Sequence, residues 1–226
     1  MRRVRMAAIL LFTSNFNFST ALMNAPLVVA MDLEGVLVPE IWIAFAEKTG
    51  SPELRLTTRD VADYHELMTH RIKILKEHNL KVQDIQAVIA TMAPLPGAQE
   101  YMSWLSARYP NVIISDTFYE FAMPLMKQLN YPTLFCNNLV VAPDGTVTGY
   151  KQRLLDGKRH AALAFKQLNF RVVAMGDSYN DTAMLAEAHL GLLFRPSDKV
   201  RAQFPQFPVV TEYSEIQSYI TEFDRG

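Results

Sequence analysis

The sequence predicts an α/β fold, a Rossmann-like doubly wound parallel sheet with a small helical cap inserted after the first strand. An apolar run at residues 27–31 has the composition of a buried parallel strand. Residues 42–93 show helical periodicity and no convincing strand pattern. From residue 97 onward, helical and strand patterns alternate, as is typical of parallel sheets with right-handed crossovers.

The segment between the first strand and residue 97 is predicted to be helical. A first helix over 40–48 should end at Gly50, and two amphipathic helices are expected over 58–79 and 82–92, where apolar residues recur every three or four positions. The cluster Pro94-Leu95-Pro96-Gly97 then breaks the helical pattern. A helical segment directly after a first strand indicates a cap over the end of that strand.

Helices and strands alternate through the rest of the chain, with an Asp144-Gly145 turn that predicts a β-hairpin. Helices are expected over 98–108, 118–129, 159–168, 181–188 and 214–223. Strands are expected over 111–115, 133–136, 139–141, 146–148, 171–175, 190–194 and 208–210. The predicted domains are therefore a core of residues 25–41 and 94–226 and a helical cap of residues 42–93.

Residues 1–24 are expected to lie outside the fold. Three arginines precede a short apolar run at residues 6–12, which superficially resembles a signal peptide. The first strand follows almost at once, however, and Met23 is an alternative start. We therefore interpret this segment as a non-functional or mis-assigned extension rather than a signal.

Composition argues against several classes of partner. The formal net charge of −1 disfavours a nucleic-acid binder that works through bulk charge. The single cysteine, Cys136, excludes an intrachain disulfide and fits a reducing compartment such as the cytoplasm. No apolar run approaches the roughly 20 residues of a membrane helix. We expect neither nucleic acid nor membrane as a partner.

Polar residues follow three predicted strands, at the edge where open α/β sheets bind ligands. The first strand ends in Asp32-Leu33-Glu34-Gly35, which offers a nucleophile or metal ligand and a proton carrier. The strand 111–115 ends in Ser115-Asp116-Thr117, a hydroxyl and N–H groups suited to an anion. The strand 171–175 is followed by Asp177 and Asp181, whose carboxylates suit Mg²⁺.

Each of these residues also has a simpler interpretation. The first acidic pair could open a surface turn, Ser115 could cap a strand end, and Asp181 could cap its helix. Lys158 is expected at the start of a helix, where the helix dipole does not favour a cation and a bound anion would explain its presence. It could instead be solvated, and so could Arg71 in the cap. Four candidate sites at neighbouring strand ends and loops of one sheet favour the catalytic interpretation.

Taken in order, these segments resemble the four motifs of the haloacid dehalogenase superfamily. Asp32-Leu33-Glu34-Gly35 resembles the first, Ser115 the second, Lys158 the third and Gly176-Asp177-Ser178-Tyr179-Asn180-Asp181 the fourth. The resemblance extends from residue 27 to about 215, and the position of the helical insert is that of the phosphoserine phosphatase branch. Within that branch, the motifs are most similar to the bacterial bifunctional phosphoserine phosphatase/homoserine phosphotransferases.

The resemblance implies an Mg²⁺-dependent phosphatase with an aspartyl-phosphate intermediate on Asp32. Glu34 would exchange protons with the leaving and attacking oxygens, while Ser115 and Lys158 would neutralise the phosphoryl group. Mg²⁺ would be held by Asp32, the main-chain carbonyl of Glu34 and Asp177, with support from Asp181.

The resemblance also implies how phosphoserine, and homoserine as an additional acceptor, would bind. Glu40 would bind the ammonium group and Arg71 the carboxylate, because a guanidinium binds a carboxylate through two hydrogen bonds. Asp116, Thr117 and Asn180 would complete the substrate site. Two alternatives remain, a phosphatase for another small phosphomonoester and an inert phospho-ligand sensor. The sensor is disfavoured because the catalytic Asp and Lys residues are retained.

Glu34 departs from the wider superfamily, which usually has aspartate at this position. Its side chain is one methylene longer, so we expect its carboxylate to sit deeper or to fold back. A displaced base would activate water less well and leave the phospho-enzyme open to an alcohol. Our hypothesis is that this substitution favours transfer to homoserine.

Overall fold

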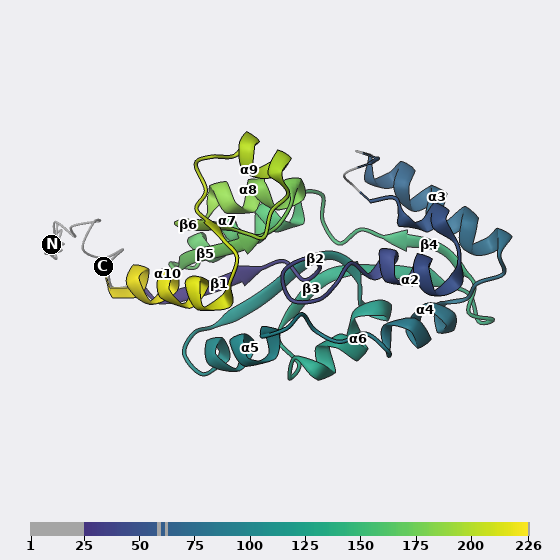
Figure 1. Ribbon diagram of the computed structural model, residues 1–226, viewed down its shortest axis with the longest axis horizontal. Helices are drawn as coiled ribbons and strands as arrows, with labels where there is room; N and C mark the ends of the chain where they lie inside the picture. The colour runs from purple at the N-terminus through teal and green to yellow at the C-terminus, as the bar shows by residue number, and fades with distance from the viewer. Residues whose placement is uncertain (1–24, 58–59, 62, 226) are drawn as a thin grey trace, which may run out of the picture.

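The computed structural model describes residues 25–57, 60–61 and 63–225, so the predicted extension 1–24 lies outside the described residues. A seven-stranded sheet with the order β4-β3-β2-β1-β5-β6-β7 forms its centre (Figure 1). Every neighbouring pair is parallel except β3 and β4. The strands are β1 (Leu27–Met31), β2 (Asn111–Phe118), β3 (Leu134–Val141), β4 (Val147–Lys151), β5 (Arg171–Gly176), β6 (Leu190–Phe194) and β7 (Val209–Val210).

Strand β1 lies at the centre of the sheet, between β2 and β5, and all five of its residues are buried. Leu27, Val29 and Met31 belong to one apolar cluster, whereas Val28 and Ala30 belong to the cluster on the opposite face. Because both faces are covered, the strand reads as a continuous apolar run. The predicted doubly wound parallel sheet is confirmed.

Helices cover both faces of the sheet (Figure 1). The first apolar cluster includes side chains from α5 (Ala98–Ser106), α6 (Tyr119–Gln128) and α10 (Tyr213–Arg225). The second includes side chains from α7 (Gly157–Gln167), α8 (Thr182–Glu187) and α9 (Asp198–Gln203). A short 3₁₀ helix, η2 (Tyr179–Asp181), precedes α8. No helix in these described ranges is long and apolar enough to span a bilayer.

The helical insert, residues 42–93, lies at one end of the sheet (Figure 1). Its elements are α2 (Ile41–Thr49), the 3₁₀ helix η1 (Pro52–Arg55), α3 (Tyr64–Glu77) and α4 (Val82–Ile89). Trp42 of α2 packs edge-on against Phe121 of α6 with ring centroids 5.5 Å apart, and both belong to the same apolar cluster. The insert therefore shares its apolar packing with the helices of the sheet. Its boundaries as a separate cap domain stay a prediction.

The bounds of three elements, α3, β2 and β3, differ from those that the sequence predicts. Helix α3 begins at Tyr64 instead of residue 58, because the Asp63 side chain accepts a hydrogen bond from the Glu66 N–H and caps the helix. Residues 58–59 and 62 lie outside the described residues. Strand β2 runs three residues beyond its predicted end. Strand β3 replaces two predicted strands, because its first half pairs with β2 and its second with β4.

Helix α9 was not predicted, although its sequence carried a signal. Ser197 precedes it and accepts a hydrogen bond from the Val200 N–H at 3.4 Å, which is the N-cap arrangement. A serine followed by aspartate and a short amphipathic segment could have indicated this helix.

His189 should make the stability of the fold depend on pH. Its main-chain N–H donates to the Val172 carbonyl at 2.8 Å, while the Nδ1 of its ring accepts from the Val172 N–H at 2.9 Å. Burial lowers the pKa of His189, as do Lys166 and Arg171. The unfolded chain therefore binds the proton more readily, so this stabilisation is present above the unfolded pKa of roughly 6.5 and is lost as the pH falls below it.

Urea unfolding at pH 7.5 and 5.5 tests this contribution. We expect His189→Gln to lose less stability than the wild type on acidification. As a control, His160→Gln, at an exposed residue of α7, should lose as much stability between pH 7.5 and 5.5 as the wild type does. Equal acid-induced losses in the wild type and His189→Gln would contradict the expectation.

Candidate active site

A pocket lies where the carboxyl ends of β1, β2 and β5 meet the helical insert. It combines acidic and hydroxyl side chains from the sheet with an arginine, a tryptophan and a tyrosine from the insert. Its lining residues are Asp32, Glu34, Glu40, Trp42, Thr57, Tyr64, Arg71, Ser115, Asp116, Thr117, Lys158, Asp177, Ser178 and Asn180. The sheet reverses its direction of strand addition at β1, where doubly wound folds bind their ligands.

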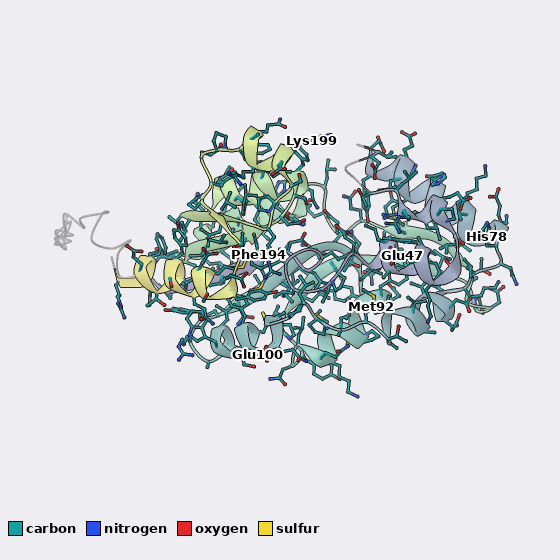
Figure 2. All side chains as sticks on the ribbon, viewed as in Figure 1. Glu47, His78, Met92, Glu100, Phe194 and Lys199 are labelled. Atoms are coloured by element: carbon teal, nitrogen blue, oxygen red, sulfur yellow. The ribbon has the colours of Figure 1, made fainter. Side chains whose placement is uncertain are left out.

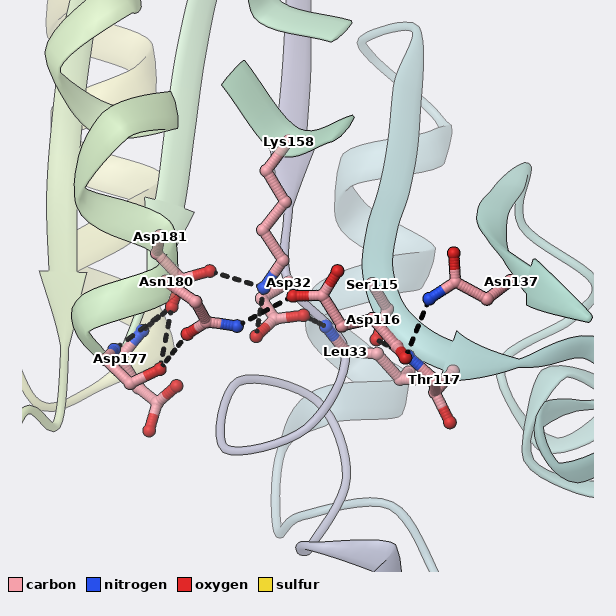
Figure 3. A network of polar contacts seen from close by, with 11 residues as sticks. Asp32, Leu33, Ser115, Asp116, Thr117, Asn137, Lys158, Asp177, Asn180 and Asp181 are labelled. Carbon is pink, nitrogen blue, oxygen red and sulfur yellow. Dashed lines mark hydrogen bonds and ion pairs between the residues drawn. The ribbon is translucent and has the colours of Figure 1, made fainter. Parts of the chain in front are cut away.

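Asp32 and Lys158 form the buried centre of the pocket (Figure 3). The Asp32 N–H donates to the Met175 carbonyl of β5 at 3.1 Å, and one carboxylate oxygen accepts from the Leu33 N–H at 2.7 Å. The other oxygen lies 2.8 Å from Lys158 Nζ. Burial raises the pKa of Asp32, an effect that Lys158 opposes and that Asp181 and Asp177 reinforce.

Lys158 lies in the first turn of α7, as predicted, and it is not solvated. Its Nζ is 2.7 Å from Asp181 Oδ1 as well as 2.8 Å from Asp32 Oδ2. Burial alone would lower the pKa of Lys158, but the charges of Asp181 and Asp32 raise it well above the usual value. The N-terminus of a helix does not favour a cation, so the carboxylates of Asp32 and Asp181 are what stabilise the charge of Lys158 here.

Three buried carboxylates converge on one point of the pocket. Oxygens of Asp32, Asp177 and Asp181 all lie within 4.8 Å of one another. Asp181 uses Oδ1 for Lys158 and Oδ2 for the N–H groups of Asp177 and Ser178, both at 3.0 Å. It makes no side-chain capping bond to α8, but through the Ser178 N–H it forms part of a capping box of η2, so its capping role belongs to the preceding 3₁₀ helix. Three such carboxylates have the chemistry of a divalent-cation site, although a role for the Glu34 carbonyl stays a prediction.

Gly35 brings the main chain close to the carboxylate cluster. Its φ is +77°, and a Cβ at this position would lie 2.6 Å from Asp177 Cγ. A side chain here would be strained by the backbone and would displace the Asp177 carboxylate. The first motif therefore needs glycine at this position because of the positive φ and the nearby Asp177 carboxylate, neither of which the sequence shows.

The three polar residues of the second motif lie within β2. The Thr117 N–H donates to Ser115 Oγ at 3.3 Å, and the Asp116 carboxylate accepts from Asn180 Nδ2 at 3.1 Å (Figure 3). Ser115 is buried inside the strand and does not cap its end, because β2 continues to Phe118. The motif therefore presents its hydroxyl and N–H groups from an ordered strand.

The Glu34 carboxylate lies toward the helical insert. It accepts a hydrogen bond from the Ile41 N–H at the start of α2, at 2.9 Å, which is the folded-back arrangement. Burial raises the pKa of Glu34 to about 7, and the charge of Glu40 adds to this. The Ile41 N–H and the Arg71 charge act in the opposite direction. A carboxyl group with this pKa can both donate and accept a proton near neutral pH.

Arg71 is a buried residue of the pocket, so the solvated interpretation is wrong. Its guanidinium lies 4.4 Å from the centroid of the Trp42 ring, and Nη2 donates to the Leu56 carbonyl at 2.9 Å. Burial lowers the pKa of Arg71 to about 10. Its Nε has no hydrogen-bond partner among the described residues, which leaves a donor for an anionic ligand.

The family is decided by a match of the haloacid dehalogenase-like hydrolase model to residues 27–189. The chain belongs to the haloacid dehalogenase-like hydrolases. The phosphoserine phosphatase ThrH of Pseudomonas aeruginosa is 56% identical over 190 residues, which are 84% of this chain and 93% of that protein. A phosphoserine phosphatase of Pseudomonas syringae pv. tomato is also 56% identical over 190 residues, covering 84% and 80%.

Solved structures share the fold of this hydrolase. One described as a phospho-aspartyl intermediate analogue of phosphoserine phosphatase superposes with a TM-score of 0.73 at 22% identity, covering 86% of this chain and 99% of that one. The family resemblance and the fold that it implied are confirmed.

Four pocket residues of this hydrolase were not predicted as site residues: Trp42, Thr57, Tyr64 and Ser178. Ser178 lies inside the fourth motif and could have been included. Tyr64 and Arg71 are seven residues apart on one helix, so helical periodicity places them on the same face. Nothing in the sequence pattern distinguished Trp42 from an ordinary apolar helix residue.

The close approach of Gly35 to Asp177 can be tested against a matched glycine. Gly50 also has a positive φ, +66°, but nothing lies within 4 Å of a Cβ there. We expect Gly50→Ala to cost about 1 kcal/mol of stability through backbone strain alone. Gly35→Ala should in addition raise the Mg²⁺ concentration needed for half-maximal thermal stabilisation by about tenfold, since it would displace a carboxylate of the candidate cation site.

Thermal unfolding across an Mg²⁺ titration measures both effects. An unchanged Mg²⁺ midpoint in Gly35→Ala would show that the cation does not depend on the Asp177 carboxylate.

Proposed function

We propose that this hydrolase is an Mg²⁺-dependent phosphoserine phosphatase that acts through an aspartyl-phosphate on Asp32 and also transfers phosphate to homoserine. The observation that carries the proposal is that one pocket is lined both by the buried pair Asp32 and Lys158 of the core and by the buried Arg71 of the insert. The first pair suits a phosphoryl group, and the arginine suits a carboxylate. The 56% identity to Pseudomonas phosphoserine phosphatases supports this choice of substrate.

The residues of the pocket have the chemistry for two successive displacements. An Asp32 oxygen attacks phosphorus, the bond from phosphorus to the serine oxygen breaks, and Glu34 gives that oxygen its proton. Glu34 then takes a proton from water, or from the homoserine hydroxyl. The resulting oxygen attacks phosphorus, and the bond to Asp32 breaks to restore the carboxylate. Lys158, Ser115 and the Thr117 N–H neutralise the phosphoryl oxygens.

The carboxylate cluster fits an Mg²⁺ ion, which prefers a few carboxylate oxygens and retains water. Asp32, Asp177 and the Glu34 carbonyl would hold it. Asp181 would act through water, because Lys158 and two N–H groups already use its oxygens. When bound, Mg²⁺ would offset the repulsion between an anionic nucleophile and an anionic phosphate.

The substrate's amino-acid end would be bound from the insert, with residues 42–93 acting as the cap. Arg71 would bind the carboxylate and Glu40 the ammonium group, while Asn180 and Asp116 would border the serine portion. A phosphatase for another small phosphomonoester is the alternative. The unsatisfied Nε of the buried Arg71 favours a substrate with a second anionic group.

Arg71→Met distinguishes the two substrates. With Mg²⁺, the wild type should release phosphate from L-phosphoserine. Arg71→Met should raise the KM for L-phosphoserine by about 100-fold, the effect of losing a charge-assisted pair of hydrogen bonds. The KM for phosphoethanolamine, which has no carboxylate, should change little.

Two control variants complete this experiment. Asp32→Asn should be inactive on both substrates, and Arg55→Met, at the exposed arginine that pairs with Glu47, should behave as the wild type. An equal rise of both KM values in Arg71→Met would contradict carboxylate recognition. A wild type inactive on L-phosphoserine would contradict the proposed substrate.

Glu34→Asp tests the link to homoserine. The shorter side chain should lose the hydrogen bond to the Ile41 N–H and place its carboxylate nearer to Asp32. We expect the ratio of phosphohomoserine formed to phosphate released, measured with L-phosphoserine and homoserine together, to fall several-fold. An unchanged ratio would refute the link.

A further inference from the structure

One main-chain carbonyl of the second motif is held from two sides. The Tyr64 hydroxyl, at the start of α3, donates to the Asp116 carbonyl oxygen at 2.9 Å. Asn137 Nδ2, on β3, donates to the same oxygen at 3.0 Å (Figure 3). One donor comes from the helical insert and the other from the sheet, so this carbonyl joins the two parts of the pocket.

The carbonyl of Asp116 and the N–H of Thr117 belong to the same planar peptide unit. Hydrogen bonds that fix the oxygen therefore also fix the direction of the N–H. That N–H points to Ser115 Oγ at 3.3 Å, at the end of the pocket that holds Asp32 and Lys158. Its orientation is thus set by two side chains from other elements, Tyr64 of α3 and Asn137 of β3.

Helix α3 also carries Arg71, seven residues after Tyr64. Residues 64, 67, 68 and 71 share one face of the helix, and Leu67 and Met68 between them are buried. The same rigid element therefore reaches the carboxylate end of the pocket through Arg71 and the phosphate end through Tyr64.

We infer that Tyr64 is a positioning residue for phosphoryl transfer, whose hydroxyl orients the Asp116–Thr117 peptide so that the Thr117 N–H lies beside Ser115 Oγ, where the transferred group would bind. The inference rests on the proposed function and extends it to a residue outside the four motifs. Because an oriented N–H stabilises charge that develops on a phosphoryl oxygen, its loss acts on the transfer step. Burial and the charge of Asp116 raise the pKa of Tyr64, which keeps the hydroxyl a donor at neutral pH.

The structure offers a matched control at Tyr150 of β4. Its hydroxyl lies 2.9 Å from His65 Nδ1 on the same insert helix, and its ring packs edge-on against Tyr64 with centroids 5.6 Å apart. Tyr150→Phe therefore removes a hydrogen bond between insert and sheet without touching the Asp116 peptide. Tyr64→Phe removes the hydroxyl on that peptide and keeps the ring contact.

Two ligands that bind at different places can show whether Tyr64→Phe acts on the Asp116–Thr117 peptide or disturbs the packing of the whole insert. Beryllofluoride with Mg²⁺ mimics a phosphoryl group on the nucleophilic aspartate, whereas L-serine occupies the amino-acid end. Tyr64→Phe should lower kcat for L-phosphoserine about tenfold, the effect of one lost hydrogen bond. It should weaken beryllofluoride binding, measured by thermal shift, by a similar factor and leave inhibition by L-serine unchanged. Tyr150→Phe should leave all three values unchanged.

Unchanged kcat and beryllofluoride affinity in Tyr64→Phe would overturn the inference. So would an equal loss of L-serine affinity, which would show displacement of α3 instead. If the wild type fails to hydrolyse L-phosphoserine, the proposed substrate is wrong, and the beryllofluoride comparison alone decides the role of Tyr64. Should Tyr64→Phe not fold, Asn137→Ala removes the second donor to the same oxygen, and unchanged beryllofluoride affinity there would also overturn the inference.

Discussion

A lysine buried between two aspartates is the constraint on which the rest of the site depends. Lys158 Nζ lies 2.8 Å from Asp32 and 2.7 Å from Asp181, and all three side chains are buried. Buried charges are costly unless they are paired and hydrogen-bonded. The surroundings meet this requirement, because the N–H groups of Asp177 and Ser178 donate to Asp181 and the N–H of Leu33 donates to Asp32. Three segments of the chain are thereby fixed together.

The two ends of the pocket have different structural origins. The proposed phosphate end is built from the carboxyl ends of β1, β2 and β5, which neighbour one another in the sheet. The proposed amino-acid end is built from the insert, where Trp42 contacts both the Arg71 guanidinium and the Phe121 ring of α6. The arginine is therefore anchored to the main core through one aromatic side chain.

Glu34 lies where these two ends meet. Its position after β1 keeps it near Asp32, while its carboxylate bonds to the first N–H of α2 and lies in the field of Glu40 and Arg71. Burial and Glu40 bring its pKa to about 7, which suits a group that gives a proton to one oxygen and takes one from the next. A glutamate serves this geometry better than an aspartate, because its longer side chain reaches the start of the helix.

The sequence by itself determined the parallel sheet, the acidic end of its first strand, and the residues of the four motifs, because these depend on local periodicity and on side-chain chemistry. It did not determine the single long β3, whose two halves pair with different strands. Nor did it show that Lys158 has two carboxylate partners, that Gly35 packs against Asp177, or that Tyr64 and Asn137 hold the same carbonyl. Each of these relations joins segments distant in the chain, and only the tertiary fold, through strand pairing in the sheet and the packing of the insert against it, brings them within contact.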